Sequence, residues 1–160
     1  MVSAHPGDLT RLMLLSIKPR HVDNILNGSK TVELRRVRPQ IGNGQPVAVY
    51  ATLPVAAVVA TCRVRKIDVA TPRAIKARHL DDAAVSTDEF DSYFAGSHQA
   101  VAIHLDTITV LENPVTLGEI RSRRSAYNPP QTWHFFDRAQ LHELLGHHRA
   151  HDDLSTLLVR

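Results

Sequence analysis

The sequence predicts an α+β protein, a small mixed β-barrel with short helices at its rim. Segments in which apolar and polar residues alternate outnumber segments with helical spacing, and short turns connect most of them. The chain shows no internal repeat and no regular alternation of strands with helices, so a mixed barrel fits best. With 160 residues, of which 43% are hydrophobic, it is long enough for one core and too short for two ordinary domains.

The chain is expected to begin its fold with a strand and a short helix. Leu12–Lys18 is an apolar run of strand length, and Pro19 ends it while suiting the first position of a helix. Apolar residues then recur at helical spacing up to Asn27. Gly28 follows where a left-handed C-terminal cap is needed, so the helix is predicted over 19–27.

A strand with one polar face is expected next. Polar and apolar residues alternate over Thr31–Val37, which places Glu33 and Arg35 side by side on one surface of the sheet. The segment Gln40–Pro46 contains two glycines and an asparagine and is predicted to be a turn-rich loop.

The middle of the chain predicts two further strands and two helices. Val47–Thr52 and Val55–Val69 have the composition of strands, with a break at Pro54, and the second is long enough to bend across a barrel. Two short helices are expected to start at Thr71 and at Ser86, where the residue pattern offers an N-cap and a capping box.

The last third predicts a strand followed by capped helices. Apolar residues alternate again over Gln99–Leu111. Thr116 and Glu119 then have the spacing of a capping box. Asp137 is expected to begin a last helix that Gly146 ends.

The organisation along the chain is predicted as an extension over 1–11, a domain over 12–136, and a C-terminal helix and tail over 137–160. Met1–Thr10 lacks the basic segment and apolar core of a signal peptide, and the longest apolar run is too short to cross a membrane. We therefore expect a cytoplasmic protein without a membrane partner. The net charge of +3 and the pI near 9.4 suit an anionic partner without requiring one.

Cysteine and histidine usage argues against a metal centre. Cys62 is the only cysteine, which excludes an intramolecular disulfide and a zinc site built on cysteine pairs, and we expect an inert core thiol. His142 and His147 are five residues apart, whereas the helical zinc-protease motif needs four. We expect no metal and no cofactor.

The segment with the most chemical content is Gly28-Ser29-Lys30-Thr31-Val32-Glu33-Leu34-Arg35, of the form GxKxxExR. Gly28 lets the chain approach a ligand, and Lys30 can offer an ammonium to a phosphate or carbonyl. Arg35 can keep Glu33 ionised, or contact the ligand while Glu33 accepts a hydrogen bond from a base amino group. By spacing alone, a solvated ion pair on a sheet is the simpler interpretation.

This segment resembles the signature of the ASCH family, a branch of the PUA-like superfamily. Leu15–Pro19, Val49–Thr52 with Pro54, and Pro129–Thr132 extend the resemblance, which covers about Leu12–Phe136. The resemblance implies a β-barrel with a cleft lined by the signature and a role in RNA metabolism or regulation. Some members of the family are similar to amidohydrolases of acetylated cytidine or to metal-independent ribonucleases.

We therefore expect a cleft that binds RNA or a nucleotide-like ligand. The residues predicted to contact the ligand are Lys18, Arg20, Gly28, Lys30, Glu33, Arg35, Arg36, Tyr50, Thr52, Gln131 and Thr132. Lys30 and Arg35 are expected on an exposed face of the cleft. Tyr50 either stacks on a base or is a half-buried barrel tyrosine. Three aromatic residues in Trp133–Phe136 are expected to plug one end of the barrel.

The leading hypothesis is a binding module, because a preformed polar cleft can recognise single-stranded or modified RNA without a cofactor. The alternative is a metal-independent hydrolase, in which Lys30, Tyr50 and Glu33 are catalytic and Thr52 assists. In the amidohydrolase branch the position matching Glu33 is a threonine, which argues against that reaction here. Duplex DNA is a weaker candidate, since the helix from Asp137 has too few basic residues for a recognition helix. The sequence predicts no oligomeric state.

Overall fold

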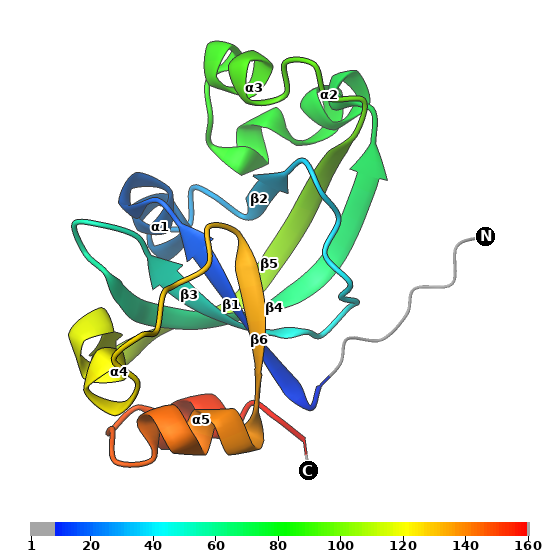
Figure 1. Cartoon of the computed structure of the whole chain (residues 1–160). Coiled ribbons are helices and arrows are strands. Elements are labelled where there is room, and N and C mark those ends of the chain that lie inside the picture. Colours follow the sequence, from blue (N-terminus) through cyan, green and yellow to red (C-terminus); the bar gives the residue numbers. More distant parts are fainter. Residues whose placement is uncertain (1–8, 160) are drawn as a thin grey trace.

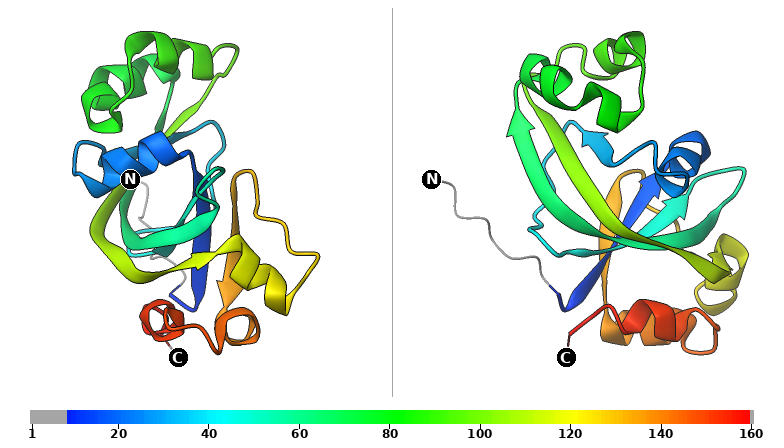
Figure 2. Two further views of the ribbon diagram at one scale, coloured as in Figure 1. Left: turned by 90° about the vertical axis from the view of Figure 1, so that its left-hand side faces the viewer. Right: turned by 180° about the vertical axis from the view of Figure 1, so that it is seen from behind.

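One curved sheet of six strands organises the computed structural model, which describes residues 9–159 (Figure 1). The strand order is β2-β5-β4-β3-β1-β6. The strands are β1 (Arg11–Ile17), β2 (Val32–Arg35), β3 (Pro46–Ala51), β4 (Ala57–Ala70), β5 (Ala100–Thr116) and β6 (Trp133–Asp137). Strands β1 and β3 are parallel, and the other neighbouring pairs are antiparallel. The sheet coils into an open, barrel-like shell (Figure 2), and the predicted α+β class is confirmed.

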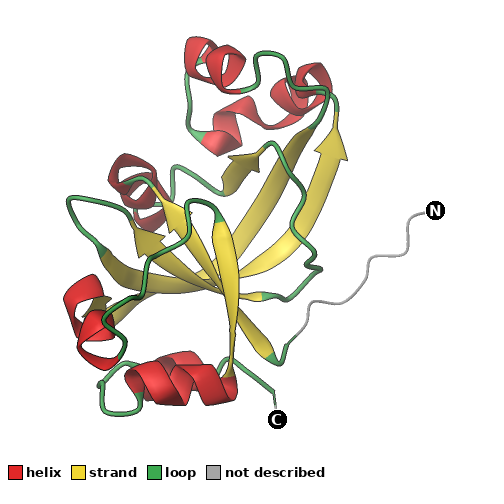
Figure 3. Cartoon of the chain, in the orientation of Figure 1, coloured by secondary structure: helices red, strands yellow, loops and turns green. Residues whose placement is uncertain are grey.

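The helices lie at the two ends of this shell (Figure 3). They are α1 (Pro19–Leu26), α2 (Pro72–Ala83), α3 (Thr87–Tyr93), α4 (Leu117–Arg123), α5 (Arg138–Leu145) and α6 (His151–Ser155). Helices α2 and α3 lie together beyond β2, whereas α4 and α5 lie at the opposite end of the sheet (Figure 1). None of the helices in the described part of the chain is long and apolar enough to span a membrane.

The two faces of the sheet pack into separate apolar clusters, because side chains alternate along each strand. On one face, Leu12 and Leu14 join the outer cluster, which lies beneath α4, α5 and α6. On the other face, Met13, Leu15 and Ile17 join an inner cluster that includes residues of α1. Strand β1 is therefore buried on both faces, which explains its nearly uninterrupted apolar sequence.

A third cluster attaches α2 and α3 to the edge strand β2. Val32 and Leu34 pack with Ile75 of α2, with Phe90 of α3 and with Phe94, which follows α3. The alternate residues Glu33 and Arg35 therefore face the inner side of the shell, where they lie opposite β5 residues of the inner cluster. The apolar contacts of β2 thus determine the direction of its two charged side chains.

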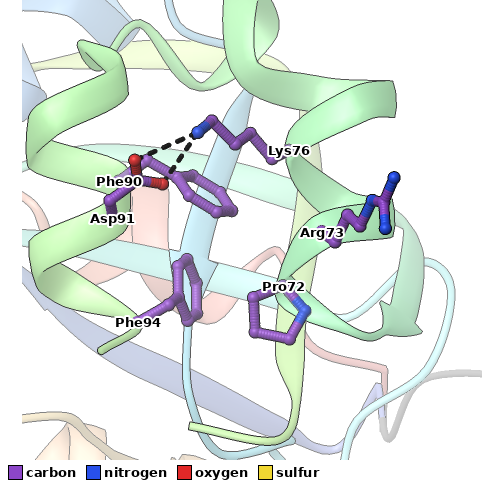
Figure 4. A pocket seen from close by; sticks show the side chains of 6 residues that line it. All are labelled: Pro72, Arg73, Lys76, Phe90, Asp91 and Phe94. Atoms are coloured by element: carbon purple, nitrogen blue, oxygen red, sulfur yellow. Dashed lines mark hydrogen bonds and ion pairs between the residues drawn. The ribbon is translucent and has the colours of Figure 1, made fainter. Parts of the chain in front are cut away.

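Helices α2 and α3 are also joined by a polar bridge over a small apolar groove of about 270 Å³ (Figure 4). Lys76 Nζ donates hydrogen bonds to both carboxylate oxygens of Asp91, at 2.8 and 3.1 Å. Phe90 and Phe94 project from α3 toward Pro72 beneath this pair. The two helices consequently form one layer above β2.

The predicted N-caps are present. The Thr116 and Glu119 capping box is complete, and Asp137 caps α5 with Gln140 completing the box. At Ser86 the hydroxyl accepts a hydrogen bond from the Glu89 N–H at 3.1 Å.

Two predictions for the C-terminal region are wrong. The aromatic segment Trp133–Asp137 is not a plug but strand β6, which pairs antiparallel with β1. Its strand character was hidden because aromatic residues occur on both of its faces. Helix α5 is not the last helix, since α6 follows it and packs Leu154 into the outer cluster. The predicted extension over 1–11 includes residues 1–8, which lie outside the described residues, and the predicted domain boundaries stay predictions.

The N-cap at Thr71 should stabilise helix α2. The Thr71 hydroxyl accepts a hydrogen bond from the Ala74 N–H at 3.2 Å, so Thr71→Ala leaves a helical donor without its partner. We expect the free energy of unfolding to fall by about 1 kcal/mol, which lowers Tm by about 2 to 4 °C. Thermal unfolding followed by circular dichroism measures this change, with Thr71→Ser as the control that keeps the cap. An equal loss in both variants would show that the hydroxyl is unimportant.

Candidate functional site

A cleft of about 780 Å³ lies where the end of β1 and the edge strand β2 face each other beneath α1 and α3. It gathers residues that are far apart in the sequence, including the loop before β6. Of the predicted ligand-binding residues, those that line the cleft are Lys18, Arg20, Lys30, Glu33, Arg35, Arg36, Thr52, Gln131 and Thr132. Their contact with a ligand stays a prediction.

Lys30 lies at the bottom of the cleft and is only 2% exposed. Its Nζ donates a hydrogen bond to the Ala83 carbonyl at the end of α2, at 2.7 Å, and lies 4.0 Å from Glu33 Oε1. The expectation of an exposed Lys30 is therefore wrong, because α2 supplies a carbonyl that captures the ammonium. Burial lowers the pKa of Lys30, the Glu33 carboxylate opposes this, and the Arg35 charge adds to the lowering.

Glu33 is a buried carboxylate placed between two cations. It is 6% exposed, and its Oε1 accepts a hydrogen bond from the Leu34 N–H at 3.1 Å. Its Oε2 lies 3.8 Å from Arg35 Nη2, which is too long for a hydrogen bond. Within residues 9–159, Oε2 is buried and has no hydrogen-bond partner. Glu33 Oε2 is thus a hydrogen-bond acceptor at the bottom of the cleft that no described residue uses.

Arg35 connects the edge strand β2 to the end of β1. Its Nη2 donates a hydrogen bond to the Ser16 carbonyl at 2.8 Å. Ser16 in turn donates through Oγ to the Pro130 carbonyl, at 2.7 Å, and through its N–H to the Thr132 carbonyl, at 3.0 Å. The guanidinium is 11% exposed rather than open, but its hydrogen bond positions three walls of the cleft relative to one another.

The mouth of the cleft is crossed by two contacts that reach α3. The exposed Arg20 guanidinium lies 2.8 Å from Glu89 Oε2, and its hydrogen bond lowers the pKa of that carboxyl. The Arg36 guanidinium stacks over the Tyr93 ring, with its carbon 4.8 Å from the ring centroid. The mouth therefore combines cations with an aromatic face.

Sequence reasoning missed His21 and the contribution of α3. His21 lines the cleft, and its buried Nδ1 has no hydrogen-bond partner among the described residues. Burial and the nearby Lys30 charge lower the pKa of His21, which favours the neutral ring. No signal in the sequence distinguished His21 from other helical residues. Glu89 and Tyr93 are more than fifty residues from the signature, and only the docking of α3 brings them to it.

Tyr50 and Gly28 do not line the cleft. Tyr50 is 3% exposed and lies in the outer cluster, because β3 directs its neighbours Val49 and Ala51 to the inner cluster instead. Burial raises the pKa of its phenol. The cleft-facing interpretation of Tyr50 is wrong, and this tyrosine belongs to the barrel wall, where it is buried rather than half-buried. Gly28 has φ +86° and turns the chain out of α1, but it is not one of the residues around the cleft.

Metal-binding groups do not converge at the cleft. No cluster of three or more His, Cys, Asp or Glu side chains that could hold a metal ion occurs over residues 9–159. Cys62 is buried, and burial raises the pKa of its thiol to about 12. These groups therefore supply no metal ligand set in the described chain.

The chain is similar to proteins from Zymomonas mobilis in both sequence and fold. A curated protein named ASCH domain-containing ribonuclease is 29% identical over 122 residues, which are 75% of this chain and 82% of the relative. The crystal structure of ASCH from Zymomonas mobilis superposes with a TM-score of 0.78 at 25% identity, covering 88% of this chain and 96% of the other. A point variant of that protein superposes with the same TM-score of 0.78. No family model matches the chain.

The similarity in sequence and the similarity in fold each extend over most of both chains. The structural match covers 88% of this chain, and Lys30, Glu33 and Arg35 of the GxKxxExR segment line the cleft. Together these findings support the assignment of this chain to the ASCH domain family.

Proposed function

We propose that this chain is an RNA-binding module that holds single-stranded RNA in the cleft between β1 and β2. The observation that carries the proposal is the composition of this one cleft, where a buried Lys30, Glu33 and Arg35 form the bottom and exposed cations surround the mouth. The name of the Zymomonas mobilis relative, a ribonuclease, supports RNA as the ligand. Cytoplasmic location and function without a cofactor stay predictions.

The size and shape of the cleft support a single strand rather than a duplex. Its volume of about 780 Å³ lies within the range of about 300 to 1,000 Å³ that is common for small-ligand sites. Sequence-specific RNA recognition usually takes unstacked bases into such pockets, whereas duplex DNA needs an element that enters a groove.

The mouth offers the two interactions that single-stranded nucleic acids use. Lys18, Arg20 and Arg36 can neutralise backbone phosphates, since all three are exposed residues of the cleft. Tyr93 and the half-buried Trp133 supply aromatic faces on which a base can stack. Bound RNA would therefore place phosphates at the mouth and a base toward the bottom.

A second candidate is a metal-independent ribonuclease, which the lowered pKa of Lys30 and the name of the relative favour. Neutral Lys30 would remove the proton of a ribose 2′-hydroxyl, and the 2′-oxygen would attack the adjacent phosphorus. The 5′-oxygen would leave with a proton returned by the Lys30 ammonium, so the products are a 2′,3′-cyclic phosphate and a 5′-hydroxyl, and Lys30 is neutral again. Arg35 or Lys18 would stabilise the negative charge of the phosphorane.

Binding remains the leading proposal because two contacts of Lys30 favour its charged form and oppose the effect of burial, which lowers its pKa. The Ala83 carbonyl accepts a hydrogen bond from its ammonium at 2.7 Å, and the Glu33 carboxylate is 4.0 Å away. Both interactions oppose release of the proton. Tyr50, the second proposed proton acceptor, lies in the outer cluster and not at the cleft.

The first test separates ligand contact from structural support. Arg36→Ala should weaken binding of a labelled single-stranded RNA by about fivefold with little change in Tm, because the side chain is an exposed part of the mouth. Arg38→Ala is the matched control, since Arg38 is exposed and is not a lining residue. Lys30→Met should instead lower the free energy of unfolding by about 1 to 3 kcal/mol, because it leaves the buried Ala83 carbonyl without its donor.

Fluorescence anisotropy and thermal unfolding of the same samples measure both effects. Equal affinity of the Arg36 and Arg38 variants would remove the mouth of the cleft from the proposed interface.

The second test is the salt dependence of binding. Each phosphate that the cleft neutralises on a single strand contributes a slope of about −0.7 to the plot of log K against log salt concentration. With three exposed cations at the mouth, we expect a negative slope that is no steeper than about −2. Anisotropy titrations at several salt concentrations give this slope. An affinity that does not change with salt would contradict phosphate contact and favour a neutral nucleoside.

The third test addresses cleavage. Any RNA cleavage by the purified protein should persist in EDTA, because the described residues provide no metal cluster. If Lys30 is the base, the rate should rise with pH and level off below the ordinary lysine pKa of about 10.4, since only the neutral amine accepts a proton. Lys30→Met should abolish the reaction, whereas Lys66→Met, an exposed control, should retain it.

Analysis of the products by chromatography distinguishes the expected cyclic phosphate from other ends. Cleavage that EDTA stops, or that survives Lys30→Met in the folded variant, would exclude this mechanism.

A further inference from the structure

We infer that Glu33 makes the cleft selective for nucleobases with an exocyclic amino group, which are adenine, cytosine and guanine, over uracil. The inference rests on the proposed binding of single-stranded RNA in the same cleft. It follows from one unused atom, the Oε2 of Glu33, and from the charges that surround it.

The two oxygens of the Glu33 carboxylate are in different situations. Oε1 accepts from the Leu34 N–H at 3.1 Å and lies 4.0 Å from Lys30 Nζ. Oε2 is equally enclosed but has no hydrogen-bond partner in the described chain. A buried acceptor without a partner is destabilising, so its presence in a folded protein calls for a water or a ligand that supplies the donor.

The charges around Glu33 determine which ligand group suits this oxygen. Lys30 and Arg35 lie on its two sides and place two positive charges next to the carboxylate. An ionised carboxylate only accepts hydrogen bonds, so its partner must carry an N–H or an O–H. A phosphate is excluded from this position because it would bring a second negative charge to the same place.

Nucleobases differ in the N–H donors that they can offer to a carboxylate. The amino groups of adenine, cytosine and guanine project beyond the ring and offer N–H donors to a carboxylate. Uracil has a single imino N–H, which lies between two carbonyl oxygens that the carboxylate would repel. Glu33 therefore accepts an amino group and disfavours the uracil edge.

The position of Glu33 suits a base rather than the backbone. It is one of the cleft residues and comes from β2, whereas the cations available to phosphates, Arg20 and Arg36, are at the exposed mouth. Oε2 is buried, so a base reaches it only when a side chain of the wall turns aside.

The experiment compares two RNA oligomers of equal length, oligo(C) and oligo(U), at neutral pH and constant salt concentration. Both are pyrimidines with the same backbone, so a difference in affinity reports the base edge. We expect the protein to bind oligo(C) about tenfold more tightly, as a hydrogen bond to a charged group implies. An oligomer of N4,N4-dimethylcytidine, which lacks the amino donors, should bind as weakly as oligo(U).

Glu33→Gln tests the residue itself, with Glu112→Gln as a control at an exposed position that does not line the cleft. The Glu33 variant should bind oligo(C) and oligo(U) with equal affinity, while the control retains the preference for oligo(C). If the original protein binds all oligomers equally, the inference is wrong although RNA binding stands.

A preference that persists in Glu33→Gln, or with the dimethylated oligomer, also overturns the inference. Failure to bind any oligomer would overturn the proposed function and the inference together. Should Glu33→Gln not fold, the three oligomers with the original protein still decide the question, because they require no variant.

Discussion

The structure around the cleft depends on the burial of Glu33 between Lys30 and Arg35. Lys30 reaches the end of α2 through the Ala83 carbonyl, and Arg35 reaches the end of β1 through the Ser16 carbonyl. The carboxylate between them offsets two positive charges that would otherwise be buried without compensation. One short segment thereby joins the helical layer, the edge strand β2 and strand β1.

This arrangement is a costly way to stabilise a fold, since buried charges lose their hydration and apolar residues of similar size are often as stable. Its retention of an unused acceptor at Glu33 Oε2 is better explained by ligand recognition than by stability. Binding and cleavage would use the same residues, and they differ in the protonation of Lys30. The contacts with the Ala83 carbonyl and Glu33 stabilise the charged form of Lys30 and so oppose its action as a base. For this reason we favour binding over catalysis.

Much of the fold was predictable because its signals are local. The proline and apolar spacing of α1, the alternation of β2 and the caps at Thr71, Thr116 and Asp137 all act within a few residues. Strand β6 was missed because an edge strand with aromatic residues on both faces has no period-two pattern. Tyr50 was assigned to the wrong face because the direction of one side chain depends on the register of β3 beside β1.

The sequence by itself determined which residues would meet within the signature, since positions 33 and 35 of one strand share a face whatever surrounds them. It also determined the α+β class through the number and spacing of its strands. Only the tertiary structure decided that Lys30 is buried, that His21 and α3 complete the cleft, and that Tyr50 lies outside it. These features depend on contacts between segments tens of residues apart, and local propensity carries no information about which distant carbonyl, ring or carboxylate will be brought within reach.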